Sequence, residues 1–171
     1  MSKLSGGEMS FDTDLQTGQQ WENVAILILQ SMGYKFVDRC FDGGWDIIMK
    51  YRNTFETETF EIKTDFTRTD NIVIEFECNK EPSGIETSEA IIWCFLFPYD
   101  WQAWLIDALK LKELCVDANT ISGGYKNRSK MYVFNKLDVI SNFQVIEYRN
   151  LLIKSIPTSL EMPEFIKKEL Q

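Results

Sequence analysis

The chain has 171 residues, 44% hydrophobic and 26% charged, as expected of a globular domain long enough to bury a core. It contains no histidine, which excludes Ser-His-Asp and Cys-His catalysis, His-ligated zinc, and any nuclease that uses histidine as its base. The net charge of −8 counts against a nucleic-acid partner, because phosphate binding is driven by Lys and Arg. Acid–base or metal chemistry must therefore rest on carboxylates, Lys, Tyr or Cys.

The sequence shows no membrane or export signal. No run reaches the roughly 18 consecutive apolar residues of a membrane-spanning helix, and residues 1–14 lack the apolar core of a signal peptide. The four cysteines form no CxxC pair, so we expect them to be reduced. These features predict a cytoplasmic protein, of a bacterium or a phage-infected host cell, with no membrane association.

The first half of the chain predicts one helix followed by strands, within a single domain over residues 1–171. Residues 1–16 are polar and are expected to form a loose lead-in. Thr17 and Gln20 have the spacing of a capping box, so we expect a helix from Thr17 that stops at Gly33, a suitable C-cap. The segments that follow have the composition of strands: 34–39, 43–51, 55–63 and 71–78.

The second half of the chain mixes helices and strands. The apolar run 91–97 is bounded by Pro98 and is typical of a fully buried strand. The other expected elements are a short helix or turn over 83–90, a strand over 101–108, a short helix over 109–115, a loop over 121–130, a strand over 131–134, a closing helix over 137–143 and a peripheral tail over 157–171. This order predicts an α/β fold in which helices flank a mixed β-sheet.

Two of the expected strands carry acidic residues that should meet. Segments 43–51 and 55–63 should form an antiparallel hairpin, and a turn centred on Asn53–Thr54 places Asp46 directly across from Glu61. Cross-strand neighbours have Cβ atoms about 4.5–5.5 Å apart. Two carboxylates at that distance repel each other unless a proton or a cation lies between them.

Lys63 completes a cluster with these two carboxylates. The two-residue period of a strand puts Glu61 and Lys63 on one face, while Phe60 and Ile62 point the other way. Asp46, Glu61 and the backbone carbonyl of Ile62 would offer Mg²⁺ or Mn²⁺ an all-oxygen site. Such an ion lowers the pKa of a bound water and neutralises phosphate charge. Lys63 would orient the attacking water or stabilise the charge of the transition state.

Glu22 is a candidate fourth member of this site. On the expected first helix it shares a face with Ala25, Ile26 and Leu29, which indicates that it points toward the sheet. There it could help to bind the metal or position water. The alternative is an acidic residue placed near the start of a helix only because the helix dipole favours it there.

The order of these features resembles the PD-(D/E)XK nuclease superfamily, especially archaeal Holliday-junction-resolvase-like and phage-encoded members. The matching residues are Glu22 in QQWENVAILILQSMGYKFV, Asp46 in GGWDIIMK, and Glu61 with Lys63 in FEIKTD. The similarity spans roughly residues 17–136 and departs from the family motif at Trp45, which replaces the proline. The resemblance implies a restriction-endonuclease-like core and a Mg²⁺- or Mn²⁺-dependent deoxyribonuclease, with endonuclease action favoured, that acts on branched or phage DNA. It also implies a homodimer, because many relatives pair.

A basic segment late in the chain is the candidate nucleic-acid contact. Residues 122–137 contain no acidic residue, although the chain as a whole is acidic. Lys126, Arg128 and Lys130 are therefore the residues expected to contact phosphates. The alternative is an ordinary solvated turn.

Plainer interpretations of the acidic residues remain open. Asp46 could simply begin a strand, and Glu61 and Lys63 could form a solvent-facing pair. Glu75 and Glu77 alternate with apolar residues, which predicts an exposed strand face. The whole chain could be a catalytically silent nuclease-fold module that binds a protein or a nucleic acid, or an accessory protein in which the pattern is accidental.

Overall fold

The computed structural model describes residues 11–40, 43–52, 54–155 and 161–170. Within them the helices are α1 (Phe11–Ser31), α2 (Ala108–Cys115), α3 (Lys136–Val139), α4 (Arg149–Ser155) and α5 (Glu164–Glu169), with short 3₁₀ turns at Gly84–Glu86, Tyr125–Asn127 and Ile140–Asn142. The strands are β1 (Tyr34–Arg39), β2 (Ile47–Tyr51), β3 (Thr57–Thr64), β4 (Asn71–Cys78), β5 (Glu81–Pro82), β6 (Ile92–Phe97), β7 (Gln102–Asp107), β8 (Asn119–Gly123), β9 (Ser129–Asn135) and β10 (Gln144–Glu147).

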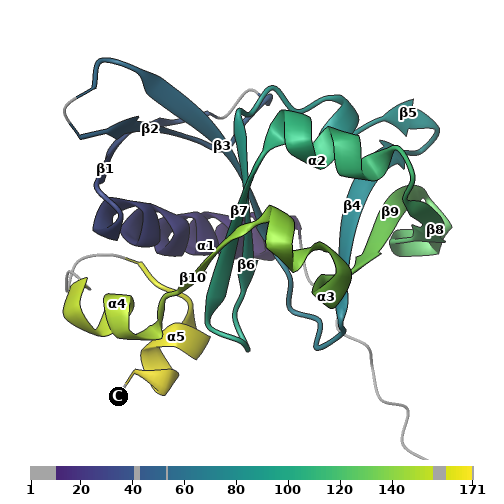
Figure 1. Ribbon diagram of the computed structural model, residues 1–171. Coiled ribbons are helices and arrows are strands. Elements are labelled where there is room, and N and C mark those ends of the chain that lie inside the picture. Colours follow the sequence, from purple (N-terminus) through teal and green to yellow (C-terminus); the bar gives the residue numbers. More distant parts are fainter. Residues whose placement is uncertain (1–10, 41–42, 53, 156–160, 171) are drawn as a thin grey trace, which may run out of the picture.

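The strands form two sheets (Figure 1). The larger sheet has the order β1-β2-β3-β6-β7-β10 and is mixed, because β3 and β6 are parallel while its other neighbours are antiparallel. The smaller sheet, β5-β4-β9-β8, is antiparallel. An α/β fold with a mixed sheet and flanking helices is therefore confirmed. The second sheet is not predicted by the sequence, and β8 begins before the region expected to be a loop and extends into it.

Each face of the larger sheet covers its own core. Along β6, Cys94 and Leu96 point to the core under α1, α4 and α5, whereas Trp93, Phe95 and Phe97 point to the core shared with α2 and the smaller sheet. This alternation follows from the two-residue period of a strand. The position of β6 between two apolar layers explains its continuous apolar sequence. The cysteines in the structure are free, as expected.

Helix α1 is longer than the sequence predicts. It begins at Phe11 rather than at Thr17, so the loose lead-in expected over residues 1–16 is wrong from Phe11 onward. Residues 1–10 lie outside the described part of the chain. The capping-box spacing of Thr17 and Gln20 therefore does not mark the start of this helix. Gly33, with φ of +103°, follows the helix as predicted.

The C-terminal segment packs on the first core. Residues 157–171 are expected to be peripheral, but Met162 and Ile166 of this segment are buried beside Tyr148 and Leu152. The apolar side of α5 therefore belongs to the core. The largely polar composition of this segment does not indicate its burial. Among the helices that the structure describes, none is long and apolar enough to cross a membrane.

Candidate functional site

The register of the β2–β3 hairpin is the one predicted from the sequence. Ile47 lies opposite Phe60, and the pairing continues without a shift toward the turn. The pairing ends at Ile47: the backbone amide of Asp46 donates to the carbonyl of Phe60 at 2.9 Å, one residue out of the register, so Asp46 lies just before the ladder and not directly across from Glu61 as predicted. The alternation of apolar residues fixes this register, because a slip by one residue would turn the apolar side chains away from the core.

Asp46, directly before β2, is held by a hydrogen bond to the backbone of β3. The amide of Ile62 donates to its Oδ2 at 2.6 Å. Burial raises the pKa of the Asp46 carboxyl, and the negative charge of Glu61 raises it further. The hydrogen bond from Ile62 and the charge of Lys63 act in the opposite direction. Asp46, Glu61 and Lys63 therefore lie close enough to influence one another electrostatically.

Glu61 has a partner for each carboxylate oxygen. Nζ of Lys63 lies 2.6 Å from its Oε1, and Oγ of Ser88 donates to its Oε2 at 3.1 Å. The Glu61 side chain is only 12% exposed, whereas that of Lys63 is 47% exposed. Lys63 also lies over the ring of Trp93, 5.7 Å from its centroid. The Glu61 carboxylate is thus fixed in place, while the side chain of Lys63 remains half-exposed.

Glu22 joins the site through an arginine that the sequence analysis missed. Nη1 of Arg39, at the end of β1, forms a short ion pair with Oε2 of Glu22 on α1. Burial raises the pKa of Glu22, Arg39 opposes that effect, and the charge of Asp46 raises the pKa further. The position of Glu22 near Asp46 agrees with the expectation that it points toward the sheet. Nothing in the segment YKFVDR indicates that Arg39 folds back onto the helix.

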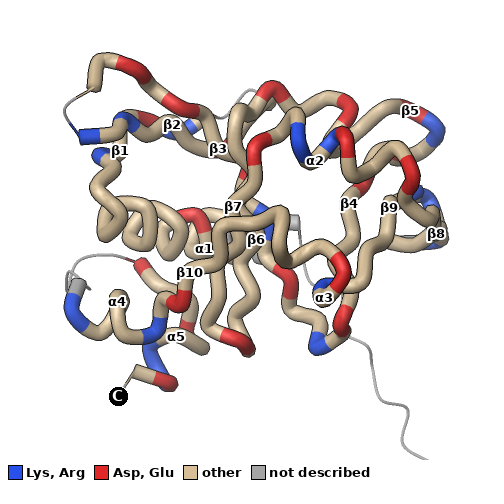
Figure 2. The backbone as a smooth tube through the Cα atoms, in the orientation of Figure 1, with Lys and Arg blue, Asp and Glu red and all other residues tan. Residues whose placement is uncertain are grey.

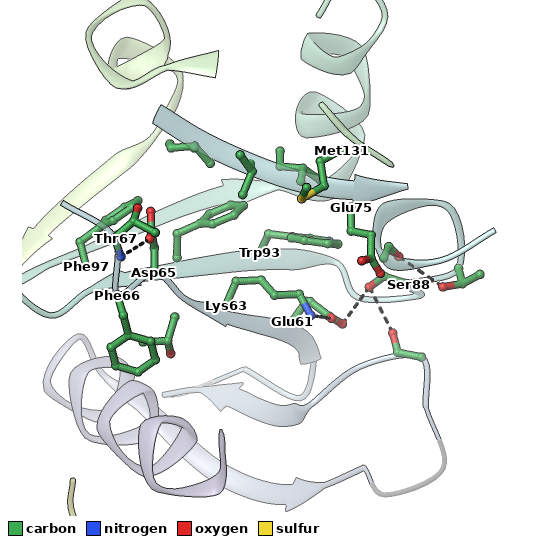
Figure 3. A pocket seen from close by; sticks show the side chains of 18 residues that line it. Glu61, Lys63, Asp65, Phe66, Thr67, Glu75, Ser88, Trp93, Phe97 and Met131 are labelled. Atoms are coloured by element: carbon green, nitrogen blue, oxygen red, sulfur yellow. Dashed lines mark hydrogen bonds and ion pairs between the residues drawn. The ribbon is translucent and has the colours of Figure 1, made fainter. Parts of the chain in front are cut away.

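Two cavities meet at Lys63. One, of about 640 Å³, opens beside α1 and is lined by Thr17, Gly18, Trp21, Glu22, Asp46, Ile62, Lys63, Thr64 and Phe66. The other, of about 630 Å³, lies between the two sheets and includes Glu61, Lys63 and Trp93 in its lining (Figure 3). Asp46 therefore borders the first cavity and Glu61 the second. Lys63 borders both.

The predicted metal ligands Asp46 and Glu61 line different cavities at this junction. In the described residues, no group of three or more Asp, Glu or Cys side chains is arranged to hold a metal ion. Mg²⁺ commonly uses only one or two carboxylates, however, and completes its shell with water and substrate phosphate. The sequence predicts Asp46, Glu61 and the carbonyl of Ile62 as such a set. A cation between the two carboxylates would relieve the repulsion that raises the pKa of Asp46.

Glu75 departs from its expected position. The sequence predicts an exposed strand face, but Glu75 is half-buried and lines the cavity between the sheets. Its Oε1 accepts a hydrogen bond from Oγ of Ser83 at 2.7 Å. A shift in the β4–β9 register lies between Glu75 and Glu77, and Glu77 pairs with Lys130 instead. The exposed-face prediction is therefore wrong for Glu75, because a sheet irregularity cannot be seen in the alternation of residues.

The basic residues lie in a different part of the molecule. Lys126, Arg128 and Lys130 belong to the β8–β9 end of the smaller sheet, where Figure 2 shows Lys and Arg near both β8 and β5. Nζ of Lys130 is 2.9 Å from Oε1 of Glu77. The cavity lined by Arg128, Lys130 and the neighbouring Lys80 shares no lining residue with the two cavities at Lys63. The structure does not join the basic segment to the Asp46–Glu61 pair.

Comparison with known proteins gives no relative from which a role could be transferred. No family model matches the sequence, and no significant match is found among curated proteins or solved structures. The fold and the site define an α/β chain with two carboxylates and a lysine gathered at one end of a β-hairpin. Its function is inferred below from those residues.

Proposed function

We propose that this chain is a DNA phosphodiesterase that uses Mg²⁺ or Mn²⁺, and that α1 and the six-stranded sheet form a restriction-endonuclease-like core. One observation carries the proposal: Asp46 is hydrogen-bonded to the backbone of Ile62, next to Glu61, and Lys63 contacts Glu61. The chemistry requires no histidine, in agreement with the composition. Endonuclease action is part of the proposal, as the resemblance to PD-(D/E)XK nucleases implies.

Each of the hairpin residues has a different role in the proposed reaction. Asp46 and Glu61, with the carbonyl of Ile62, would hold the cation. A bound cation supplies a water of lowered pKa and neutralises charge on the phosphate. The half-exposed side chain of Lys63 borders both cavities, where it would orient the attacking water and stabilise the negative charge that develops on the phosphate.

In this proposal Glu22 and Arg39 assist the reaction indirectly, from the cavity that Glu22 and Asp46 both line. Burial raises the pKa of Glu22, and the ion pair with Arg39 opposes that effect. Glu22 lines the same cavity as Asp46, so it can accept a hydrogen bond from a water bound there. We therefore assign Glu22 as a positioning residue and Arg39 as its partner.

A catalytically silent binding module is the second candidate. It is favoured by the direct contact of Lys63 with Glu61, which neutralises that carboxylate without a metal ion. The same contact is compatible with catalysis if a cation displaces Lys63 from Glu61 when substrate binds. Cleavage separates the two candidates.

The test is a cleavage assay on linear duplex, single-stranded, branched and covalently closed circular DNA with Mg²⁺ or Mn²⁺. We expect at least one substrate to be cut, and cutting of closed circles would identify an endonuclease. Asp46→Asn should abolish cleavage, whereas Asp117→Asn, at an exposed turn after α2, should not. A folded protein that leaves the whole panel uncut with both metals would overturn the proposal. DNA binding without cleavage would then support the silent module.

A further inference from the structure

Phe66 lies where the two cavities of the candidate site meet. The residues that line both cavities are Lys63, Thr64 and Phe66. The Phe66 side chain is 47% exposed, whereas the other aromatic residues that line the two cavities are at most 3% exposed. Among the described aromatic residues at these cavities, Phe66 is therefore the one that offers ring surface to a ligand.

A short turn after β3 holds Phe66 in this position. The backbone amide of Asp65 donates to the carbonyl of Leu96 on β6 at 2.9 Å, which ties the start of the turn to the sheet. Oδ1 of Asp65 accepts a hydrogen bond from the backbone amide of Thr67 at 2.7 Å. An aspartate that bonds to the backbone two residues further along fixes a tight turn. Phe66 lies between these two residues, so the turn positions it without the help of a ligand.

Helix α1 supports the ring of Phe66 from one side. Trp21 of α1 is 2% exposed and meets Phe66 in a T-shaped contact, with ring centroids 5.5 Å apart and an interplanar angle of 72°. Figure 3 shows the Phe66 side chain directed toward α1 and away from Trp93, which lies between the two sheets. One T-shaped contact covers at most one face of the Phe66 ring. The ring is thus held in place and can still stack on a second flat group.

We propose that Phe66 stacks on one unpaired base of the DNA strand whose phosphate lies at Lys63. This inference rests on the proposed function, because it assumes that the strand to be cut passes Lys63. Every base has a flat face, so aromatic side chains stack on bases irrespective of the sequence. Lys63 and Phe66 line the same two cavities, which lets one strand contact both side chains, the first through a phosphate and the second through a base.

The stacking contact selects the structure of the DNA and not its sequence. In an intact duplex each base is covered on both faces by its neighbours, so Phe66 could stack only after a base has been displaced. Displacing a base costs free energy, and the cost is least for a base that is mismatched or already single-stranded. The favoured substrates are therefore single strands, strand ends and branch points, where a base next to the cut bond is already unpaired.

The experiment compares a single-stranded thymidine oligonucleotide with an abasic strand of equal length, which carries the same phosphates but no bases. Fluorescence anisotropy measures binding with Ca²⁺ in place of Mg²⁺, because Ca²⁺ also takes oxygen ligands, and a gel confirms that the strands stay intact. We expect wild-type protein to bind the thymidine strand at least about tenfold more tightly than the abasic strand, the effect of one stacked base. Phe66→Leu keeps an apolar side chain against Trp21 and should lower this preference about tenfold, whereas Phe66→Trp should retain it. Phe55→Leu removes a ring that is 98% exposed and lines neither cavity, so it should change the preference less than about twofold.

Several results would overturn this inference. Wild-type protein that binds neither strand, or both equally, would do so without reference to any variant. Equal losses of preference in Phe66→Leu and Phe55→Leu, when both keep the wild-type unfolding midpoint, would do so as well. Metal-dependent cleavage is measured separately. Cleavage without a base preference would remove this role of Phe66 and leave the proposed function intact, whereas a preference that depends on Phe66 without cleavage would leave the stacking site and remove the nuclease.

Discussion

The hairpin site and the basic end of the smaller sheet show how differently the same kinds of charge behave in one chain. Asp46 is half-buried, and burial and Glu61 raise its pKa, so its charge depends on its neighbours. Lys130 is exposed, and its contact with Glu77 is a surface ion pair of a kind that contributes little to stability. The comparison teaches that burial makes the charge of Asp46 depend on its neighbours, so we expect the largest functional effects at the hairpin.

Lys63→Ala should give the largest effect. We expect cleavage to fall at least about 100-fold, the loss typical when one group that stabilises transition-state charge is removed. The fold should persist, because the Lys63 side chain is half-exposed and Ser88 still holds Glu61. Initial cleavage rates and thermal unfolding curves measure the two effects. Lys50→Ala, on the same hairpin, is the control; a Lys63→Ala enzyme that cuts as fast as this control would contradict the assignment.

Arg39→Ala should lower the free energy of unfolding by about 1–3 kcal/mol, because it leaves the partly buried Glu22 carboxylate without its partner. Lys35→Ala, at an exposed position of the same strand, should change it by less than about 0.5 kcal/mol. Urea unfolding of both variants measures the difference. Equal losses would show that burial does not strengthen the Arg39–Glu22 pair.

Replacing both Lys126 and Arg128 by Ala should weaken DNA binding several-fold at low salt and little at high salt. Each phosphate contact contributes about 0.7–0.9 to the slope of log affinity against log salt, so the slope should fall by about 1.5. Fluorescence anisotropy over a range of salt concentrations measures it. A variant with Lys110 and Lys112 of α2 replaced carries the same charge change, and identical slopes in the two variants would remove the basic segment from the interface.

Asp46→Asn should produce the smallest effect, on the pH dependence of stability without metal. Because the pKa of Asp46 is raised above its ordinary value of 3.8, the folded state keeps this proton to a higher pH than the unfolded state does. The free energy of unfolding should therefore fall as the pH rises from 3.8 through the folded-state pKa, and Asp46→Asn should remove part of that fall. Denaturant unfolding between pH 3.5 and pH 7 (about the range set by ordinary carboxyl pKa values) provides the measurement. Parallel curves for both proteins would contradict the burial of Asp46.

The alternation of apolar and polar residues predicted the part of the site that lies on consecutive strands, the β2–β3 hairpin. The hairpin register follows from the alternation of apolar residues, so the sequence predicts that Asp46 lies near Glu61, although Asp46 lies just outside the paired ladder and not directly across from Glu61. Strand β4 has the bounds predicted for it, but its partner does not follow from its residues. The same alternation suits either sheet. Which strands pair is decided by packing over the whole chain.

Contacts between distant segments were not predictable for the same reason. Arg39 reaches Glu22, Ser88 reaches Glu61, and each pair joins segments that only the complete fold brings together. No local periodicity marks these residues. The inward position of Glu75 depends on a register irregularity and on packing of the smaller sheet against the larger one.

Binding of Mn²⁺ tests the central claim, a cation shared by Asp46 and Glu61, most directly. Isothermal titration calorimetry should show that the wild-type protein binds Mn²⁺ and that Asp46→Asn and Glu61→Gln each weaken binding at least about tenfold, since each removes a charged ligand. Lys63→Ala should bind Mn²⁺ at least as tightly as wild type, because the ammonium group that contacts Glu61 is gone. Absent Mn²⁺ binding, or equal affinity in wild type and Asp46→Asn, would contradict the account.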